Sequence, residues 1–241
     1  KHDPGDDVPR LVLADWLQEQ GDPRGELLAL EVEIDRLAES DPRREKLRRR
    51  ERLLLDQYGT TWLGPLVDLP LTWRFERGFP HLEAHADRFL CDEVNDMVGH
   101  GAFDFVLSLK LTELRGPGLG RLARSPLLDA VPCLDLTDNR LGDDGLSALL
   151  DSPRLSALRS LTLHQNRLGP RGATALAGCP GLAGLRALHL GRNRVGDEGA
   201  FALAGSPHLG GLSHLDVAHN HVSSDGLALL RARFGDAVRW S

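Results

Sequence analysis

Leu134-Asp135-Leu136-Thr137-Asp138-Asn139-Arg140-Leu141 is the stretch of sequence that decides the fold. Its pattern, L-x-L-x-x-N-x-[LV], returns every 27 residues through four copies. The asparagines of the four copies are Asn139, Asn166, Asn193 and Asn220. Alternate residues of a strand point to the same side, so the two leucines of each copy face inward. A fixed period of this length indicates one structural unit per repeat, stacked on its neighbours.

The second half of each repeat has the pattern of a helix. Residues 143–150 begin with acidic side chains and then carry apolar ones at helical spacing. Glycines at 145, 172, 199 and 226 and prolines at 153, 180 and 207 keep the same phase. One step of 27 back predicts a fifth strand at Leu107 and Leu109, with Thr112 in place of the asparagine.

These repeats resemble the leucine-rich repeat family of the ribonuclease-inhibitor-like kind, over residues 104–235. The resemblance implies an α/β solenoid with a curved parallel sheet on its concave face, helices on its convex face and a helical N-terminal cap. It also implies that the asparagines form a structural ladder between turns. A buried amide just after a strand can bond to loop backbone groups that have no ladder partner, so a catalytic role for them is disfavoured.

The remaining chain predicts capping segments. We expect a helical cap over residues 1–70, an entry strand and degenerate repeat over 71–106, repeats over 107–235 and a C-terminal cap over 236–241. Start signals and spacing predict helices over 8–20, 22–38 and 40–58, with Trp16 in their core. Phe234, Val238 and Trp240 are expected to close the far end, because end repeats otherwise expose apolar side chains.

The run RLVLADWLQEQGDPRGE, residues 10–26, resembles a bacterial family called the repeat-companion domain. The likeness extends over about residues 4–40 and implies a bacterial source, with no established activity. The usual opening residues of that family are absent, so we interpret Lys1 as the edge of a longer chain.

Composition excludes several classes of protein. Forty-eight of 241 residues are leucine, the net charge is −6, and 27% of residues are charged. This balance disfavours disorder, a transmembrane helix, and charge-driven binding to nucleic acid or membrane. Cys91, Cys133 and Cys179 are odd in number and widely spaced, which predicts reduced thiols, a cytoplasmic location and no zinc site. We also expect a monomer without cofactors.

Two clusters were candidates for chemistry. His164, His189 and Asp216 should meet on adjacent strands, where a polar surface is favoured over a metal site. Seven basic residues crowd 43–52, but Glu45 can pair with Arg49, so a solvated helix face is favoured over a nucleic-acid patch. No catalytic motif was found, and we expect no enzymatic activity.

The function expected from this architecture is protein binding on the concave face. Outward strand positions should form two columns, beginning with Ser108 beside Asp135 and Lys110 beside Thr137. The residues expected to contact a partner are His164, His189, Arg192, Asp216, Asp135, Asp138 and Gln165. Two alternatives stay open: an activator-like regulator of a small GTPase, or the substrate-recognition arm of a larger enzyme.

Overall fold

The computed structural model describes residues 7–240, which form two compact units. The first unit comprises the chain up to Leu69 together with Trp73–His81, and the second comprises Pro70–Thr72 and the chain from Leu82 onward. Residues 1–6, interpreted above as the edge of a longer chain, and Ser241 of the predicted C-terminal cap lie outside the described residues.

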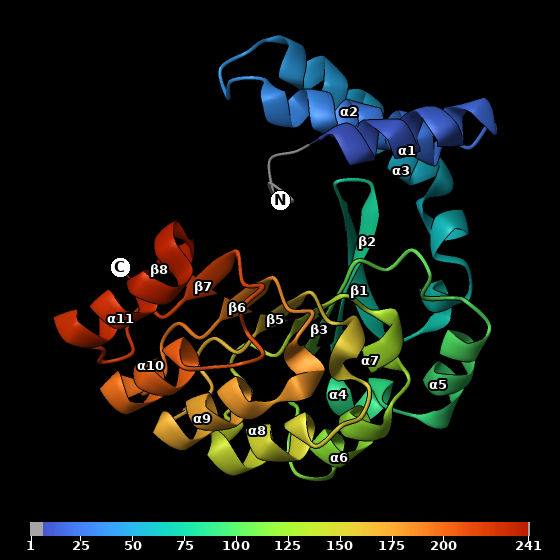
Figure 1. The fold of residues 1–241 in the computed structure, drawn as a ribbon. Helices are drawn as coiled ribbons and strands as arrows, with labels where there is room; N and C mark the ends of the chain where they lie inside the picture. The colour runs from blue at the N-terminus through green and yellow to red at the C-terminus, as the bar shows by residue number, and fades with distance from the viewer. Residues whose placement is uncertain (1–6, 241) are drawn as a thin grey trace. The chain divides into compact units, whose positions relative to one another are not determined.

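The first unit is built of three helices and the tip of a β-hairpin (Figure 1). The helices are α1 (Val8–Glu19), α2 (Arg24–Arg36) and α3 (Arg43–Leu63), followed by the 3-10 turn η1 (Gly64–Asp68). The hairpin strands are β1 (Leu71–Glu76) and β2 (Phe79–His85).

Two aspartates fix where α2 and α3 begin. Asp22 Oδ1 accepts a hydrogen bond from the Arg24 amide at 2.9 Å, and Asp41 Oδ1 accepts one from the Arg43 amide at 2.9 Å. The first amides of a helix have no partner inside the helix, so a side-chain oxygen stabilises its start. Helix α2 thus begins at Arg24 and α3 at Arg43, two and three residues after the predicted bounds.

Helix α3 continues past Gly59, where the sequence predicted its end, and stops at Gly64 instead. Gly64 has φ of 54°, a conformation that glycine adopts without steric cost. Gly59 stays helical because the Trp73 ring packs against it: an added β-carbon would lie 3.3 Å from that ring. Gly59 therefore serves close packing and not helix termination.

The core of the first unit lies between α1 and α2. Ala14, Leu17 and Leu28 are buried there, and Phe79 packs against them. The prediction that Trp16 joins this core is wrong, because its side chain is 56% exposed. Successive helix residues turn by about 100°, so a residue between positions 14 and 17 points away from α2.

The second unit contains the repeats. Its elements after the hairpin are α4 (Ala86–Phe89), α5 (Asp92–Gly99), β3 (Ser108–Thr112), α6 (Pro117–Arg124), α7 (Leu127–Ala130), β4 (Cys133–Asp135), α8 (Gly142–Leu150), η2 (Leu155–Ala157), β5 (Ser160–Thr162), α9 (Pro170–Gly178), η3 (Pro180–Leu182), β6 (Ala187–His189), α10 (Gly196–Ala204), β7 (His214–Asp216), α11 (Ser224–Phe234), η4 (Gly235–Ala237) and β8 (Val238–Arg239).

The strands form one sheet in chain order, β1 to β8, and the pairings from β3 to β8 are parallel. Figure 1 shows helices α8, α9, α10 and α11 along one side of the repeats and strands β5, β6 and β7 along the other. Inward strand leucines such as Leu161 and Leu188 are fully buried between the two layers. The predicted α/β solenoid is confirmed.

The asparagines link successive repeats through their side chains. Asn166 Oδ1 accepts from the Asn139 amide at 3.1 Å and the Leu141 amide at 3.3 Å. Its Nδ2 donates to the Leu136 carbonyl at 2.7 Å and to the His164 carbonyl at 3.2 Å. Asn139, Asn193 and Asn220 bond in the same manner, and all four are buried. Each amide thus pairs backbone groups that the short strands leave unpaired.

The first repeat departs from the 27-residue phase. Leu109 pairs with Leu134 and Lys110 with Asp135, a step of 25 residues, so the predicted alignments of Leu107 and Ser108 are wrong. Asn139 Oδ1 accepts from the Leu114 amide at 2.7 Å, which puts Leu114, not Thr112, in the place of the asparagine. The turn between β3 and α6 is shorter than the corresponding turns of later repeats. The aligned glycines of the helices keep the 27-residue spacing, so they do not reveal the shorter turn.

The aligned glycines lie where neighbouring helices approach most closely. A β-carbon on Gly199 would lie 2.8 Å from the Ala173 β-carbon on α9 and 2.6 Å from Val195. One on Gly172 would lie 2.5 Å from Asp143 Oδ1. The glycines therefore set the spacing of the helix layer.

We predict that Gly199→Ala destabilises the repeats by about 1–3 kcal/mol, the cost of overpacking a filled interior. Gly178→Ala is the matched control, because no atom lies within 4 Å of its added methyl group. The control should be neutral or slightly stabilising, since alanine restricts the unfolded chain. Urea unfolding followed by circular dichroism compares them, and equal midpoints would contradict the packing role.

Two of the residues expected to close the last repeat differ in burial. Val238 is buried and lies beside Leu215 on the last strand pair. Trp240, in contrast, is 43% exposed, with the Arg231 guanidinium 3.6 Å from its ring centroid. Val238 contributes to the core, whereas Trp240 covers a basic side chain at the surface.

Candidate functional site

The outward side chains of the strands form the floor of the concave face. The burial pattern of β4 to β7 alternates, with the middle residue buried and its neighbours half-buried. The register defines a central column of Lys110, Asp135, Thr162, His189, Asp216 and Arg239. It defines a second column of Ser108, Cys133, Ser160, Ala187 and His214.

The column that contains Cys133 and His214 was not predicted from the sequence. Cys133 and its equivalents lie two residues before the central column, so they face the same side of the sheet. The alternation that identified Asp135 as outward could have identified them as well. The important addition is His214, which brings a further imidazole to the floor.

Imidazoles gather on strands β6 and β7. The rings of His189 and His214 lie 4.8 Å apart between centroids, tilted by 39°. Burial lowers the pKa of His189 first of all, and the neighbouring His214 lowers it further, against the opposing effect of Asp216 and Asp135. His189 is therefore held toward its neutral form, able both to donate and to accept a hydrogen bond.

His164 and Asp216 meet over Gly191, as their sequence positions predicted. A β-carbon on Gly191 would lie 2.6 Å from His164 Nδ1 and 3.3 Å from Asp216 Oδ2. Gly191 is buried beneath these two side chains. Glycine at this position allows an imidazole to fold onto the floor of the sheet, which a larger residue would prevent.

The floor aspartates are partly engaged in local turns. Asp135 Oδ1 accepts from the Thr137 amide at 2.8 Å and from the Thr137 hydroxyl at 2.6 Å. Asp216 Oδ1 accepts from the Ala218 amide at 2.9 Å. These turns hold both carboxylates in fixed positions, so neither side chain is a freely rotating surface group.

A row of exposed residues lies just after the strands. Asp138, Gln165, Arg192 and His219 occupy it, and all have φ between 55° and 58°. Glu113 has φ of 56° in the first repeat, which agrees with the 25-residue step. The left-handed backbone reverses the chain after each strand and leaves these side chains exposed at the edge of the floor.

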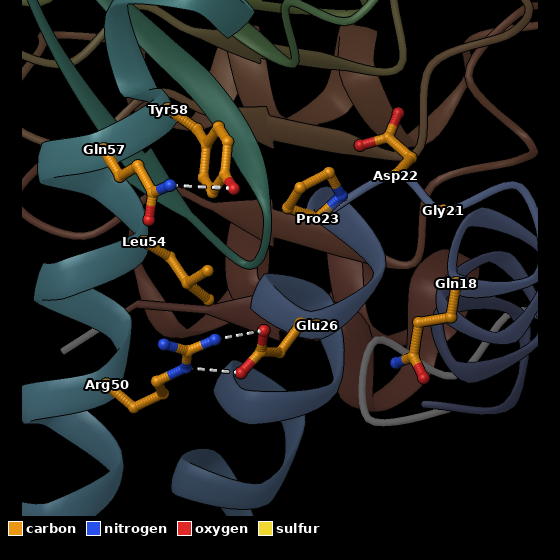
Figure 2. Close-up of a pocket in the computed structure, with 9 residues that line it drawn as sticks. All are labelled: Gln18, Gly21, Asp22, Pro23, Glu26, Arg50, Leu54, Gln57 and Tyr58. Atoms are coloured by element: carbon orange, nitrogen blue, oxygen red, sulfur yellow. Dashed lines mark hydrogen bonds and ion pairs between the residues drawn. The ribbon is translucent and has the colours of Figure 1, made fainter.

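The first unit has a separate pocket of about 390 Å³ (Figure 2). Gln18, Gly21, Asp22, Pro23, Glu26, Arg50, Leu54, Gln57 and Tyr58 line it. Arg50 donates to both oxygens of Glu26, at 2.5 and 2.7 Å, and Gln57 Nε2 donates to the Tyr58 hydroxyl at 2.9 Å. Its charged groups are therefore already paired within the protein.

The basic cluster on α3 is largely tied to the first unit itself. Arg44 donates to the Ile34 and Leu37 carbonyls at 2.6 and 2.8 Å, at the end of α2. Four further arginines of this helix form ion pairs with carboxylates. Glu45 pairs with Arg52 at 3.3 Å, whereas the sequence predicted Arg49. This pairing favours a structural role for the cluster over a phosphate-binding one.

The three cysteines are free thiols, of which Cys179 serves packing. All three lie within the described residues and form no disulfide. Cys91 directly precedes α5. Cys179 is buried, and its thiol contacts the Leu150 carbonyl at 3.8 Å. Ser152 and Ser206 make the equivalent bond to Ala123 and Ala177.

Two further properties of the described chain bear on chemistry. Residues 7–240 contain no group of three or more His, Cys, Asp or Glu side chains placed to hold a metal ion. None of the helices in that range combines the length and apolarity needed to cross a membrane.

Comparison with known families gives one match. The family model described as Leucine Rich repeat matches residues 133–150, 185–204 and 212–230. A search of curated proteins finds no match. The three matched segments each include a strand and all or most of the helix that follows it. The chain therefore carries leucine-rich repeats, and the second unit is a leucine-rich-repeat solenoid.

Proposed function

We propose that this protein is a non-enzymatic protein-binding module whose contact surface is the concave floor. The observation that supports this most directly is a pair of contacts on adjacent repeats: His164 and Asp216 lie over Gly191, and the ring of His189 lies 4.8 Å from that of His214. Packing requires the inward leucines, but nothing in the fold requires these outward side chains. Leucine-rich repeats generally mediate protein–protein interaction, which agrees with the proposal.

The proposed surface has a centre and a margin. His164, His189, Arg192 and Asp216 form the centre, while Asp135, Asp138 and Gln165 extend it toward the first repeats. Half-buried imidazoles offer flat, partly apolar surfaces with hydrogen-bonding edges. Such groups suit recognition of a protein partner, because they can be buried with little loss of conformational freedom.

We also propose a finer classification of both units. The helices α8 to α11 in successive repeats support the ribonuclease-inhibitor-like kind. The helical first unit, with the sequence RLVLADWLQEQGDPRGE in α1 and α2, supports a repeat-companion domain that caps the repeats. A bacterial source, a cytoplasmic location and a monomeric state remain predictions.

A combined variant tests the contact surface. We expect His164→Ala, His189→Ala, Arg192→Ala and Asp216→Asn together to weaken binding of an affinity-purified partner by at least ~2 kcal/mol, about 30-fold in Kd. Asparagine at position 216 keeps the oxygen that accepts from the Ala218 amide. Isothermal titration calorimetry gives the Kd, and circular dichroism should show an unchanged fold.

The control variant reverses charge on the helix side of the repeats. Glu198→Lys on α10 changes an exposed residue at the opposite layer and should leave the Kd unchanged. If Glu198→Lys abolishes binding and the floor variant binds normally, the contact surface lies on the helices and the proposal is wrong.

A further inference from the structure

The tip of the β-hairpin is held on α2 by a buried carboxylate. Glu31 Oε2 accepts a hydrogen bond from the Gly78 amide at 2.5 Å. The side chain of Glu31 is 5% exposed, and its other oxygen, Oε1, is buried without a hydrogen-bond partner among the described residues. A buried carboxylate with one oxygen unsatisfied is costly when ionised.

The backbone at the tip fits closely against α2. Gly78 has φ of 78°, and an added β-carbon would lie 2.3 Å from Leu28 Cδ2. The neighbouring Arg77 pairs with Asp35 at 3.5 Å. The tip is therefore attached at three adjacent points, of which the Glu31 bond is the buried polar one.

The charges around Glu31 come from every element packed against it. Helix α3 contributes Glu51, whose carboxylate accepts from Arg48 at 3.0 Å. Asp35 lies on α2, and Arg10 of α1 is 3.9 Å from Asp35. Burial first of all, and then the neighbouring Glu51 and Asp35, raise the pKa of Glu31 to about 7, against the opposing effects of the Gly78 bond and Arg48. The closed tip thus favours the protonated acid near neutral pH.

We propose that Glu31 is a proton-controlled latch, which keeps the hairpin tip on α2 while protonated and releases it when ionised. An ionised Glu31 would accept from Gly78 more strongly, but its second oxygen would be charged, dry and close to Glu51. When the tip leaves α2, water reaches that oxygen, and the free-energy cost of the buried charge is removed. The tip belongs with the helices, and the base of the same hairpin belongs with the repeats. The latch therefore acts on the segment through which the chain passes between the two units.

Amide hydrogen exchange of Gly78 in the full chain tests the latch. After correction for intrinsic exchange, the opening constant should rise by about one to two orders of magnitude between pH 5 and pH 8.5, because opening releases a proton. The Leu163 amide, which donates to the His189 carbonyl in the repeats, should show no such rise. A constant Gly78 opening across this range would overturn the proposal.

Two variants distinguish ionisation of Glu31 from a general loss of stability of the first unit. Glu31→Gln cannot ionise, so its Gly78 opening should not depend on pH. Glu51→Gln removes a neighbouring charge and should move the midpoint to lower pH while keeping the dependence. The Glu31 carboxyl can also be titrated directly by carbon-13 NMR in the unmodified chain. A midpoint near its ordinary value of about 4.3 would overturn the proposal, whatever the variants do.

Discussion

Asn166→Ala is expected to cost the repeats at least about 3 kcal/mol of unfolding free energy. The side chain makes four hydrogen bonds to backbone groups of its own and the preceding repeat, and it is fully buried. Alanine would leave those amides and carbonyls unpaired in a dry interior, where each unsatisfied group costs about 1–3 kcal/mol. Local relaxation of the structure recovers part of this cost. The expected loss of unfolding free energy is therefore given as at least about 3 kcal/mol and not as the full sum over the unpaired groups.

Gln165→Ala is the matched control for this variant. Gln165 is adjacent, also carries an amide and also has a left-handed backbone, with φ of 58°, but its side chain is exposed. The control should change the free energy by about 0.5 kcal/mol or less. Urea unfolding followed by circular dichroism measures both, and similar midpoints would mean that the asparagine bonds contribute little to stability.

The stability of the first unit is expected to fall by about 3 kcal/mol from low pH to pH 8 through Glu31 alone. The pKa of Glu31 is about 7 in the folded protein, whereas an unperturbed glutamate has a pKa of 4.5. Because the folded value is the higher one, the contribution is fully present below pH 4.5 and is lost as pH rises through 7. Each pKa unit corresponds to about 1.4 kcal/mol, which gives the magnitude.

Tryptophan fluorescence isolates the first unit for this measurement. Trp16, Trp62 and Trp73 lie in it, so a Trp240→Phe background removes the tryptophan of the second unit. In that background Glu31→Gln should be more stable than the parent at pH 8 and should lose most of the pH dependence between pH 5 and pH 8. A parent whose midpoint of denaturation is flat over this range would contradict the assignment.

Repetition made the solenoid predictable from the sequence. Leucines and asparagines at a fixed period require an inward layer and buried amides, because packing in every repeat imposes the same demand. The outward direction of Asp135 and His189 followed from strand alternation in the same way. The meeting of His164 with Asp216 was also predicted, since it needs only the repeat length and the spacing of parallel strands.

The register of the first repeat and the burial of residues in the first unit depended on contacts that no local sequence pattern shows. The shortened turn after β3 moved Lys110, not Ser108, beside Asp135. The exposure of Trp16 and the helical Gly59 depend on which faces of α1 and α3 meet their neighbours. The identity of an apolar residue or a glycine does not show which element will pack against it. Its role therefore depends on the tertiary packing.

The sequence by itself determined the fold class, the four-asparagine ladder and the central column from Asp135 to Asp216, because each repeats a short-range rule. Only the tertiary structure decided that the ring of His214 lies against that of His189 and that Glu31 meets Gly78 across 47 residues of chain. In the sequence Glu31 is one more acidic residue on a helix with solvent-facing glutamates. Its buried contact exists because the hairpin tip folds onto α2, and long-range proximity of this kind follows from the whole packed unit.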